Sequence, residues 1–213
     1  MSQLLHALPT LATIVAVALV LVSLSGAIAL ERQRINSSAA AAAFDKVLRR
    51  GERARALKIA RVMDGPQLLL VRYMLSLRLP RMRFYRDPAH YRDGARSESF
   101  ERRARIDVDA WLAPRMARVV RRGVLGAALG GLAAAAAVLA LWLGVDGVLR
   151  YAAIGAAFAG GVCAIWVVYC WRAITHGVTL MRETCMPFVV PEEEMDDDAR
   201  AAAREAAEAL RGA

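Results

Sequence analysis

The residues best placed to do chemistry in this chain are arginines, and the chemistry they offer is the binding of anions. The stretch from Pro80 to Ser99 has little apolar periodicity but is rich in aromatic residues, Pro, Gly and Ser, which predicts a loop. Guanidinium groups beside aromatic rings suit anionic lipid headgroups or a partner protein, and the alternative is a solvated linker without a ligand. The candidate lipid-binding or partner-binding residues are Arg81, Arg83, Arg86, Arg92 and Arg96.

Catalysis and metal binding have little support in the sequence. His6, His90 and His176 lie far apart, and no cluster of His, Cys, Asp or Glu has the spacing of a metal site. No nucleophile motif, phosphate-binding loop or pair of intramembrane carboxylates is present. We therefore expect no enzyme activity, no cofactor, no bound metal and no small-molecule substrate. The three cysteines, Cys163, Cys170 and Cys185, have no paired spacing, which predicts reduced thiols.

Three apolar stretches dominate the rest of the chain. They run from about Leu8 to Leu30, from Gly123 to Val145 and from about Val148 to Ile174. Each is long enough to cross a bilayer, and each must do so as a helix because its backbone polar groups find no partner in lipid. The sequence thus predicts an all-α integral membrane protein with three transmembrane helices and a helical cytoplasmic section between the first and second.

The predicted organisation has four parts. Residues 1–30 form the first transmembrane helix, residues 31–122 the basic cytoplasmic section, residues 123–174 a transmembrane hairpin and residues 175–213 an acidic cytoplasmic tail. The hairpin must be antiparallel, because only Val145, Asp146 and Gly147 are available to turn the chain between the second and third spans. A cleaved signal peptide is the alternative for the first span, but no positively charged region precedes it.

Charge predicts the orientation of the chain. Residues 31–122 carry 23 Lys and Arg against 10 Asp and Glu, whereas no Lys or Arg precedes Glu31. Positive loops stay in the cytoplasm, so we expect the N-terminus outside and the middle section and C-terminus in the cytoplasm. Because this section supplies the excess charge of a chain with a pI of about 10.3, no nucleic-acid partner is expected.

Helical periodicity extends into the cytoplasmic section. We expect the first helix to continue through the alanine run Ala39–Ala43 and to end before Gly51. Shorter helices are predicted from Glu52 to about Met63 and from Gln67 to Leu79. A longer one, from Phe100 to Arg122, should lead directly into the second span and use Trp111 and Met116 for packing. The tail is expected to form a solvated helix that ends near Leu210.

Small residues mark faces of the last two spans where helices could approach closely. Gly126 and Gly130 form a Gly-x-x-x-Gly spacing in the second span, and similar residues occur in the third. These faces favour a tightly packed hairpin and a subunit interface, and the alternative is a general richness in alanine. The same residues are candidates for lining a pore. The candidate pore-lining or helix-packing residues are Gly126, Gly130, Ala157, Gly160, Gly161 and Ala164.

This layout resembles the TolQ and ExbB branch of the MotA/TolQ/ExbB proton-channel family. The stretch from Phe44 to Gly51, followed by Ala56-Leu57, Ala60 and Gly65-Pro66, is similar to that family's cytoplasmic pattern. The run from Ala117 to Gly123 resembles its approach to the second span. In the third span, Ala156–Gly160 followed by Ala164-Ile165 resembles a segment that contains Thr, Gly and Ala-Ile-Pro in the family. The resemblance implies a location in the bacterial inner membrane, membrane lipid contact, a homo-oligomer such as a pentamer, and a single-span partner of the TolR or ExbD kind.

The polar residues of the family's pore are missing from this sequence. The Thr of the third span falls on Ala157, its preceding acidic residue on Ala152 and its Pro on Trp166, and no hydroxyl occurs from Gly123 to Val145. We expect an energy-transducing or envelope-spanning scaffold with weak or altered ion conduction, in which the partner carries the proton-binding Asp. The alternative is a non-conducting membrane anchor that organises a protein complex through its Arg-rich section.

Overall fold

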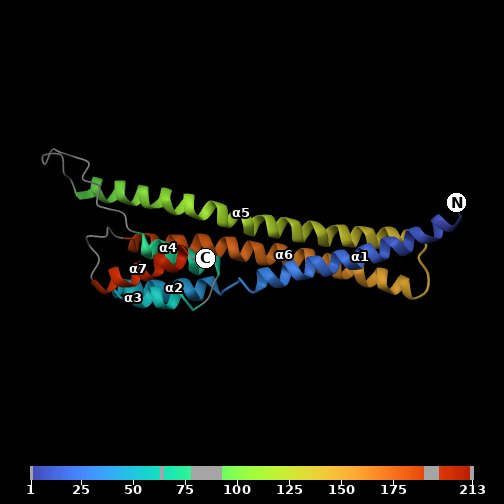
Figure 1. Ribbon diagram of the computed structural model, residues 1–213, viewed down its shortest axis with the longest axis horizontal. Helices are drawn as coiled ribbons and strands as arrows, with labels where there is room; N and C mark the ends of the chain where they lie inside the picture. The colour runs from blue at the N-terminus through green and yellow to red at the C-terminus, as the bar shows by residue number, and fades with distance from the viewer. Residues whose placement is uncertain (1, 63–64, 78–92, 190–196, 212–213) are drawn as a thin grey trace. The chain divides into compact units, whose positions relative to one another are not determined.

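The computed structural model describes residues 2–62, 65–77, 93–189 and 197–211. Its helices are α1 (Ser2–Glu31), α2 (Ser37–Arg49), α3 (Arg53–Ala60), α4 (Pro66–Ser76), α5 (Asp93–Trp142), α6 (Val148–Cys185), the short 3-10 helix η2 (Met186–Phe188) and α7 (Asp197–Arg211) (Figure 1). No strand occurs among these residues. The prediction of an all-α protein is confirmed.

Three of the helices, α1, α5 and α6, contain stretches long and apolar enough to cross a membrane. In their most apolar windows only 22%, 28% and 33% of the residues are buried within the chain. The exposed positions carry large apolar side chains such as Leu11, Val124 and Phe158. Such a surface is stable where hydrocarbon surrounds the helix and costly where water does. The chain is therefore a multi-pass membrane protein with three spans.

The chain packs as two compact units. Unit 1 contains residues 1–34 and 117–173, and unit 2 contains residues 35–116 and 174–213. Both units include parts of α5 and α6, because the boundary falls at residue 116 in α5 and at residue 173 in α6. Unit 1 thus holds α1 and the apolar parts of α5 and α6, whereas α2, α3, α4 and α7 all belong to unit 2.

The antiparallel hairpin predicted for the second and third spans is present in unit 1. A Cβ added at Gly123 would lie 2.8 Å from Cγ of Trp171, one at Gly126 would lie 3.2 Å from Cγ1 of Val167, and one at Gly130 would lie 2.8 Å from the carbonyl oxygen of Gly160. At successive contacts the residue numbers increase along α5 and decrease along α6, so the two helices run in opposite directions.

A glycine turn reverses the chain between α5 and α6. Gly144 and Gly147 have φ angles of +80° and +63°, a left-handed conformation that glycine adopts without steric cost. Gly144 lies two residues beyond the end of α5 at Trp142, and the next amide, that of Val145, donates to the carbonyl oxygen of Ala140 at 3.2 Å. This bond closes the end of the helix. The sequence placed the end of the second span at Val145, a few residues beyond the observed end of α5 at Trp142.

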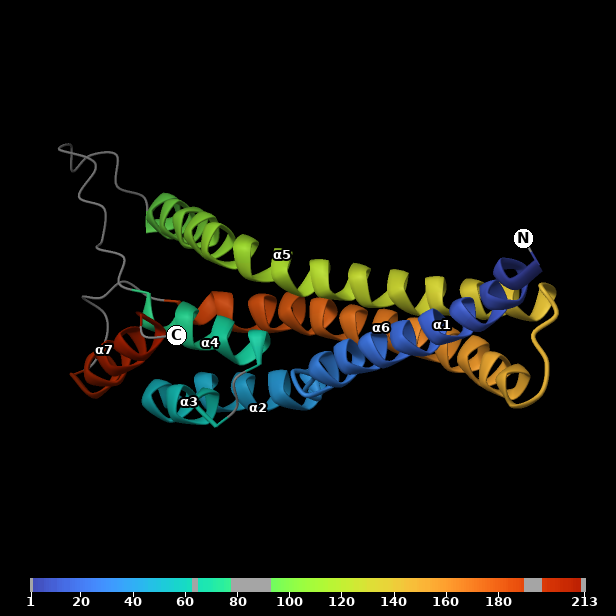
Figure 2. The same ribbon diagram turned by 45° about the vertical axis from the view of Figure 1, so that its right-hand side comes forward.

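Unit 2 has its own hydrophobic core, to which every helix of the unit contributes. Its fully or almost fully buried members include Phe44 of α2, Leu57 of α3, Leu70 and Met74 of α4, Val108 of α5, Met181 of α6 and Ala203 of α7. Trp111, predicted as a packing residue, stacks on Tyr73 with ring centroids 4.3 Å apart, and Met116 packs against the same core. Figure 2 shows α3, α4 and α7 side by side in this unit.

The position of α7 supports the number of spans. It packs against α3 and α4, with Ala203 and Ala206 fully buried and Nη1 of Arg61 2.7 Å from Oε1 of Glu205. Two membrane crossings, those of α5 and α6, separate α4 from α7 along the chain. Two crossings return the chain to the side from which it entered, so a three-span topology brings these helices to the same side.

Three expectations about local structure are wrong. The first helix does not continue into the alanine run, because α1 ends at Glu31 and α2 begins at Ser37, where Oδ1 of Asn36 accepts from the Ala39 amide at 3.2 Å as an N-cap. Residues 93–99, predicted as loop, form the start of α5. The tail helix is not solvated on all sides, since α3 and α4 cover one of its faces.

Candidate functional site

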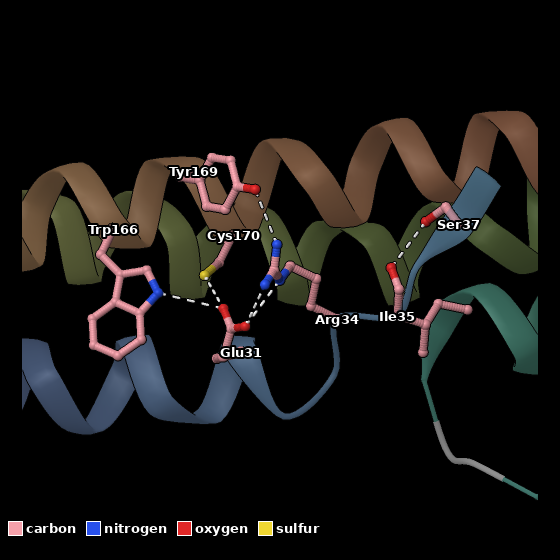
Figure 3. Close-up of polar contacts among 7 residues, drawn as sticks. All are labelled: Glu31, Arg34, Ile35, Ser37, Trp166, Tyr169 and Cys170. Carbon is pink, nitrogen blue, oxygen red and sulfur yellow. Dashed lines mark hydrogen bonds and ion pairs between the residues drawn. The ribbon is translucent and has the colours of Figure 1, made fainter. Parts of the chain in front are cut away.

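The end of α1 carries a polar cluster with α6 inside unit 1, shown in Figure 3. Oε1 of Glu31 accepts hydrogen bonds from Nε and Nη2 of Arg34 at 3.0 and 2.6 Å. Oε2 of Glu31 accepts from Sγ of Cys170 at 2.9 Å and from Nε1 of Trp166 at 3.3 Å. The second amino group of Arg34, Nη1, donates to the Tyr169 hydroxyl at 3.0 Å. The cluster thereby joins α1 to α6.

Helix geometry and charge explain how this cluster is arranged. Trp166, Tyr169 and Cys170 are three and four residues apart, so they share one face of α6. Glu31 is the last residue of α1, where a carboxylate meets the negative end of the helix dipole. Arg34 offsets that repulsion, and its hydrogen bond to Glu31 in turn raises the pKa of the guanidinium. The result is a fixed ion pair with hydrogen bonds to both carboxylate oxygens, which stabilises the contact between α1 and α6.

Two buried hydroxyl groups lie along α1. Oγ of Ser23 donates to the carbonyl oxygen of Gly126 at 2.9 Å and so links α1 to α5. Oγ1 of Thr13 donates to the carbonyl oxygen of Pro9 at 2.8 Å within α1 itself. Both hydroxyls are satisfied by backbone in the interior of unit 1, where a polar group without a partner would be costly. They act as helix-packing groups in this arrangement.

The candidate small residues occupy different places in unit 1. Gly126 and Gly130 of α5 face α6, and Gly160 faces back toward α5, with the Ala164 amide next to Gly130. Ala157 packs against the buried cluster formed by Ala16, Ala137 and Ala156. A Cβ added at Gly161 would have no neighbour within 4 Å. Gly126, Gly130 and Gly160 therefore line the hairpin contact, and Gly161 is directed away from it.

The candidate arginines between Arg81 and Arg96 fall almost entirely outside the described part of the chain. Arg81, Arg83, Arg86 and Arg92 lie outside the described residues. Arg96 belongs to the first turns of α5, and its side chain also lies outside the described part. The prediction that these residues bind lipid or a partner stays a prediction.

Other candidate sites in the described chain offer little chemistry. No group of three or more His, Cys, Asp or Glu is placed to hold a metal ion among the described residues. Cys163, Cys170 and Cys185 are all buried and free. An open hollow of about 530 Å³ in unit 2 lies between α2 and the end of α6, but its Asp45 is paired with Arg49 at 2.7 Å and no feature of the hollow indicates a ligand.

Comparison with known proteins adds no relative. No protein-family model, curated protein or solved structure matches the chain. The resemblance to the TolQ and ExbB branch therefore stays a prediction from sequence motifs. The function has to be argued from the residues of this chain.

The cluster around Glu31 was not predicted from the sequence. The 135-residue to 139-residue separation between Glu31 and its partners on α6 leaves no local pattern in the sequence. One indication was present, because Glu31 is the only Asp or Glu before Asp45 and directly follows the first apolar stretch. The polar atoms of Trp166 and Cys170 on one face of a membrane helix also need a partner.

Proposed function

We propose that this protein is a TolQ/ExbB-like inner-membrane subunit of a proton-motive-force-coupled, energy-transducing or envelope-spanning complex. In this proposal it forms an oligomeric scaffold around a single-span partner and conducts ions weakly or in an altered way. The observation that carries the proposal is the joint packing of α7 with α3 and α4, which builds one extramembrane body from the segment after the third span and the segment between the first two. An extramembrane body of this kind on every subunit suits a ring-forming scaffold.

The polar groups of unit 1 favour weak conduction. Residues 8–30, 123–145 and 151–171 contain no Asp, Glu, Lys, Arg or His. The buried hydroxyls of Thr13 and Ser23 donate to backbone carbonyl groups. Proton transfer through a membrane requires ionisable groups or a wetted polar path, so the proton-carrying carboxylate of the proposed complex must come from the partner.

A second function has a specific observation in its favour. The absence of any hydroxyl or charged residue from Gly123 to Val145 also suits a protein that moves no ion. In that case the chain is a membrane anchor or adaptor that organises a complex through its basic section, which holds 23 Lys and Arg in residues 31–122.

Partner capture separates the two functions. The tagged protein is purified from its own host in mild detergent, and co-purifying proteins are identified by mass spectrometry. A single-span protein with an intramembrane Asp supports the scaffold, whereas soluble or unrelated membrane proteins alone support the adaptor.

Proton flux gives an independent test of the same proposal. Proteoliposomes containing the purified chain and the captured partner are monitored with a pH-sensitive dye under an imposed membrane potential. Flux that needs the partner and is lost when its intramembrane Asp is changed to Asn supports the scaffold. Equal dye response in empty liposomes and in liposomes with both proteins contradicts a role in proton coupling.

A further inference from the structure

One end of unit 1 carries a concentration of exposed arginines. Arg118, Arg121 and Arg122 lie on α5 directly before the uncharged stretch that begins at Gly123, and Arg32 follows the end of α1. All four are exposed, and no hydrogen bond or ion pair joins their side chains to another residue of the described chain. We call these four residues the arginine end.

The two helices bring these arginines to the same level of the unit. Ala16 packs with Ala137, and Oγ of Ser23 donates to the carbonyl oxygen of Gly126, so α1 and α5 run in opposite directions. Arg32 lies nine residues beyond Ser23, and Arg118 lies eight residues before Gly126. At about 1.5 Å of rise per residue, both are displaced by roughly 12–14 Å toward the same end.

The three arginines of α5 share one face of the helix. Arg118 is three residues from Arg121 and four from Arg122, the spacings at which side chains on a helix are neighbours. Like charges at these spacings repel each other and destabilise a helix. No carboxylate of the described chain pairs with them, so an anion from outside the chain is the natural source of charge to offset their repulsion.

Their depth indicates which anion this is. Gly123 begins a stretch of 23 residues without a charge, which spans the hydrocarbon core, so Arg118–Arg122 lie about 1–8 Å outside it along the helix axis. The phosphate groups of lipids occupy this layer. The opposite end of unit 1 has Asp146 and Arg150, whose charges cancel, and so offers no comparable attraction.

We propose that the arginine end is a binding site for the phosphate headgroup of an anionic phospholipid. Arg118, Arg121 and Arg122 bind the phosphate layer from α5, and Arg32 binds it from the end of α1. These four residues are not among the candidate arginines of residues 80–99, and those of α5 directly precede the uncharged stretch that begins at Gly123. It does not depend on the proposed oligomer or partner.

Lipid binding to the detergent-purified protein tests this site. Phosphatidylglycerol and phosphatidylcholine with the same acyl chains are titrated, and bound lipid is counted by native mass spectrometry. Phosphatidylglycerol should bind more tightly. The double variant R118Q/R122Q should lower its affinity about 25-fold, since each arginine near a membrane surface contributes roughly fivefold. The matched control R102Q/R103Q removes two exposed arginines from α5 in unit 2 and should leave the affinity unchanged.

Two further experiments use the native protein without substitutions. Raising the salt concentration to about 0.5 M should reduce the preference of the native protein for phosphatidylglycerol, because salt screens exposed charges. Glycerol phosphate at the concentration of the lipid should not compete, because it lacks acyl chains. Equal binding of the two lipids, an equal loss in both double variants, a salt-independent preference or competition by glycerol phosphate would each overturn the assignment.

Discussion

Gly130 and Gly160 lie backbone against backbone in the hairpin of α5 and α6. A Cβ added at Gly160 would be 2.7 Å from the carbonyl oxygen of Gly130 and 2.9 Å from the amide nitrogen of Ala134. Real Cβ atoms do not come this close to backbone, so only glycine fits without a shift of one helix. The small-residue face predicted for close helix packing is therefore used, at these two positions, in the hairpin of one chain.

This contact predicts a difference between adjacent glycines. Gly160→Ala should lower the free energy of unfolding by about 1–3 kcal/mol, the usual cost of overpacking. Gly161→Ala should be neutral or slightly stabilising, because Gly161 has no neighbour within 4 Å of a new Cβ and Ala is the better helix former. Unfolding in mixed detergent and SDS measures both. Equal stability of the two variants would contradict the observed contact.

The cluster around Glu31 predicts that this carboxylate stabilises unit 1. Glu31→Ala removes the acceptor of hydrogen bonds from Arg34, Trp166 and Cys170, so the thermal unfolding midpoint should fall. Asp146→Asn is the control, because Asp146 is the other acidic residue of unit 1 and lies exposed in the turn. The prediction fails if Glu31→Ala melts at the temperature of the native protein, or if Asp146→Asn is affected as strongly.

The docking of α7 can be tested with two alanines on the same helix. Ala206 is fully buried, whereas Ala209 is exposed. Ala206→Arg places an unpaired charge in the contact and should release α7, so amide hydrogen exchange in residues 197–211 should increase about tenfold or more. Ala209→Arg should exchange like the native protein. Slow exchange of α7 in Ala206→Arg would show that α7 does not depend on this contact.

Burial of Tyr73 predicts a loss of stability at alkaline pH. Tyr73 stacks on Trp111, and desolvation by burial raises the pKa of its hydroxyl above the ordinary value of 10.0. The folded chain therefore keeps the proton that the unfolded chain loses, so stability should fall as pH rises above about 10 toward the folded pKa. Tyr73→Phe should reduce this alkaline fall. Thermal unfolding between pH 9 and about 11.5 measures it.

The control for Tyr73 is Tyr151→Phe. Tyr151 has 77% of its surface exposed. Its substitution should leave the alkaline decrease in stability as it is in the native protein. Identical pH profiles for the native protein and Tyr73→Phe would mean that Tyr73 ionises equally well in the folded and unfolded states.

The spans and the hairpin could be predicted from sequence because hydrocarbon imposes a simple rule on composition. A stretch such as Gly123–Val145 has no charged residue and few other stable environments. The turn also followed from chain length, since so few residues separate the second and third spans. Both properties are local, and local properties can be inferred from one sequence.

The break after α1 could not be inferred in the same way. Ala39–Ala43 is a strong helix former, and it suggested one continuous helix. In the structure α1 ends at Glu31 and α2 begins after the N-cap residue Asn36. The mostly polar residues between the two helices therefore interrupt the helix, despite the high helix propensity of the alanines that follow. Asn36 before Ser37 was the available indication, because Asn is among the preferred N-cap residues.

The docked tail and the Glu31 cluster depend on contacts between distant segments. Nothing in the sequence distinguishes Ala203 and Ala206 from the exposed alanines of the same charged helix, although α3 and α4 bury both of them. Glu31 likewise finds Cys170 only after α1 and α6 have packed together. Neither pairing has a local sequence pattern, so neither could be inferred from the spacing of residues along the chain.

The proposed function requires that this three-span chain assembles into a homo-oligomer. The most direct test is the native mass of the purified protein in a mild detergent or in lipid nanodiscs, measured over a range of concentrations. We expect one species whose mass is a fixed multiple of the 23.1 kDa chain, with a pentamer as the expected form. A mass equal to one chain at every concentration would contradict the claim.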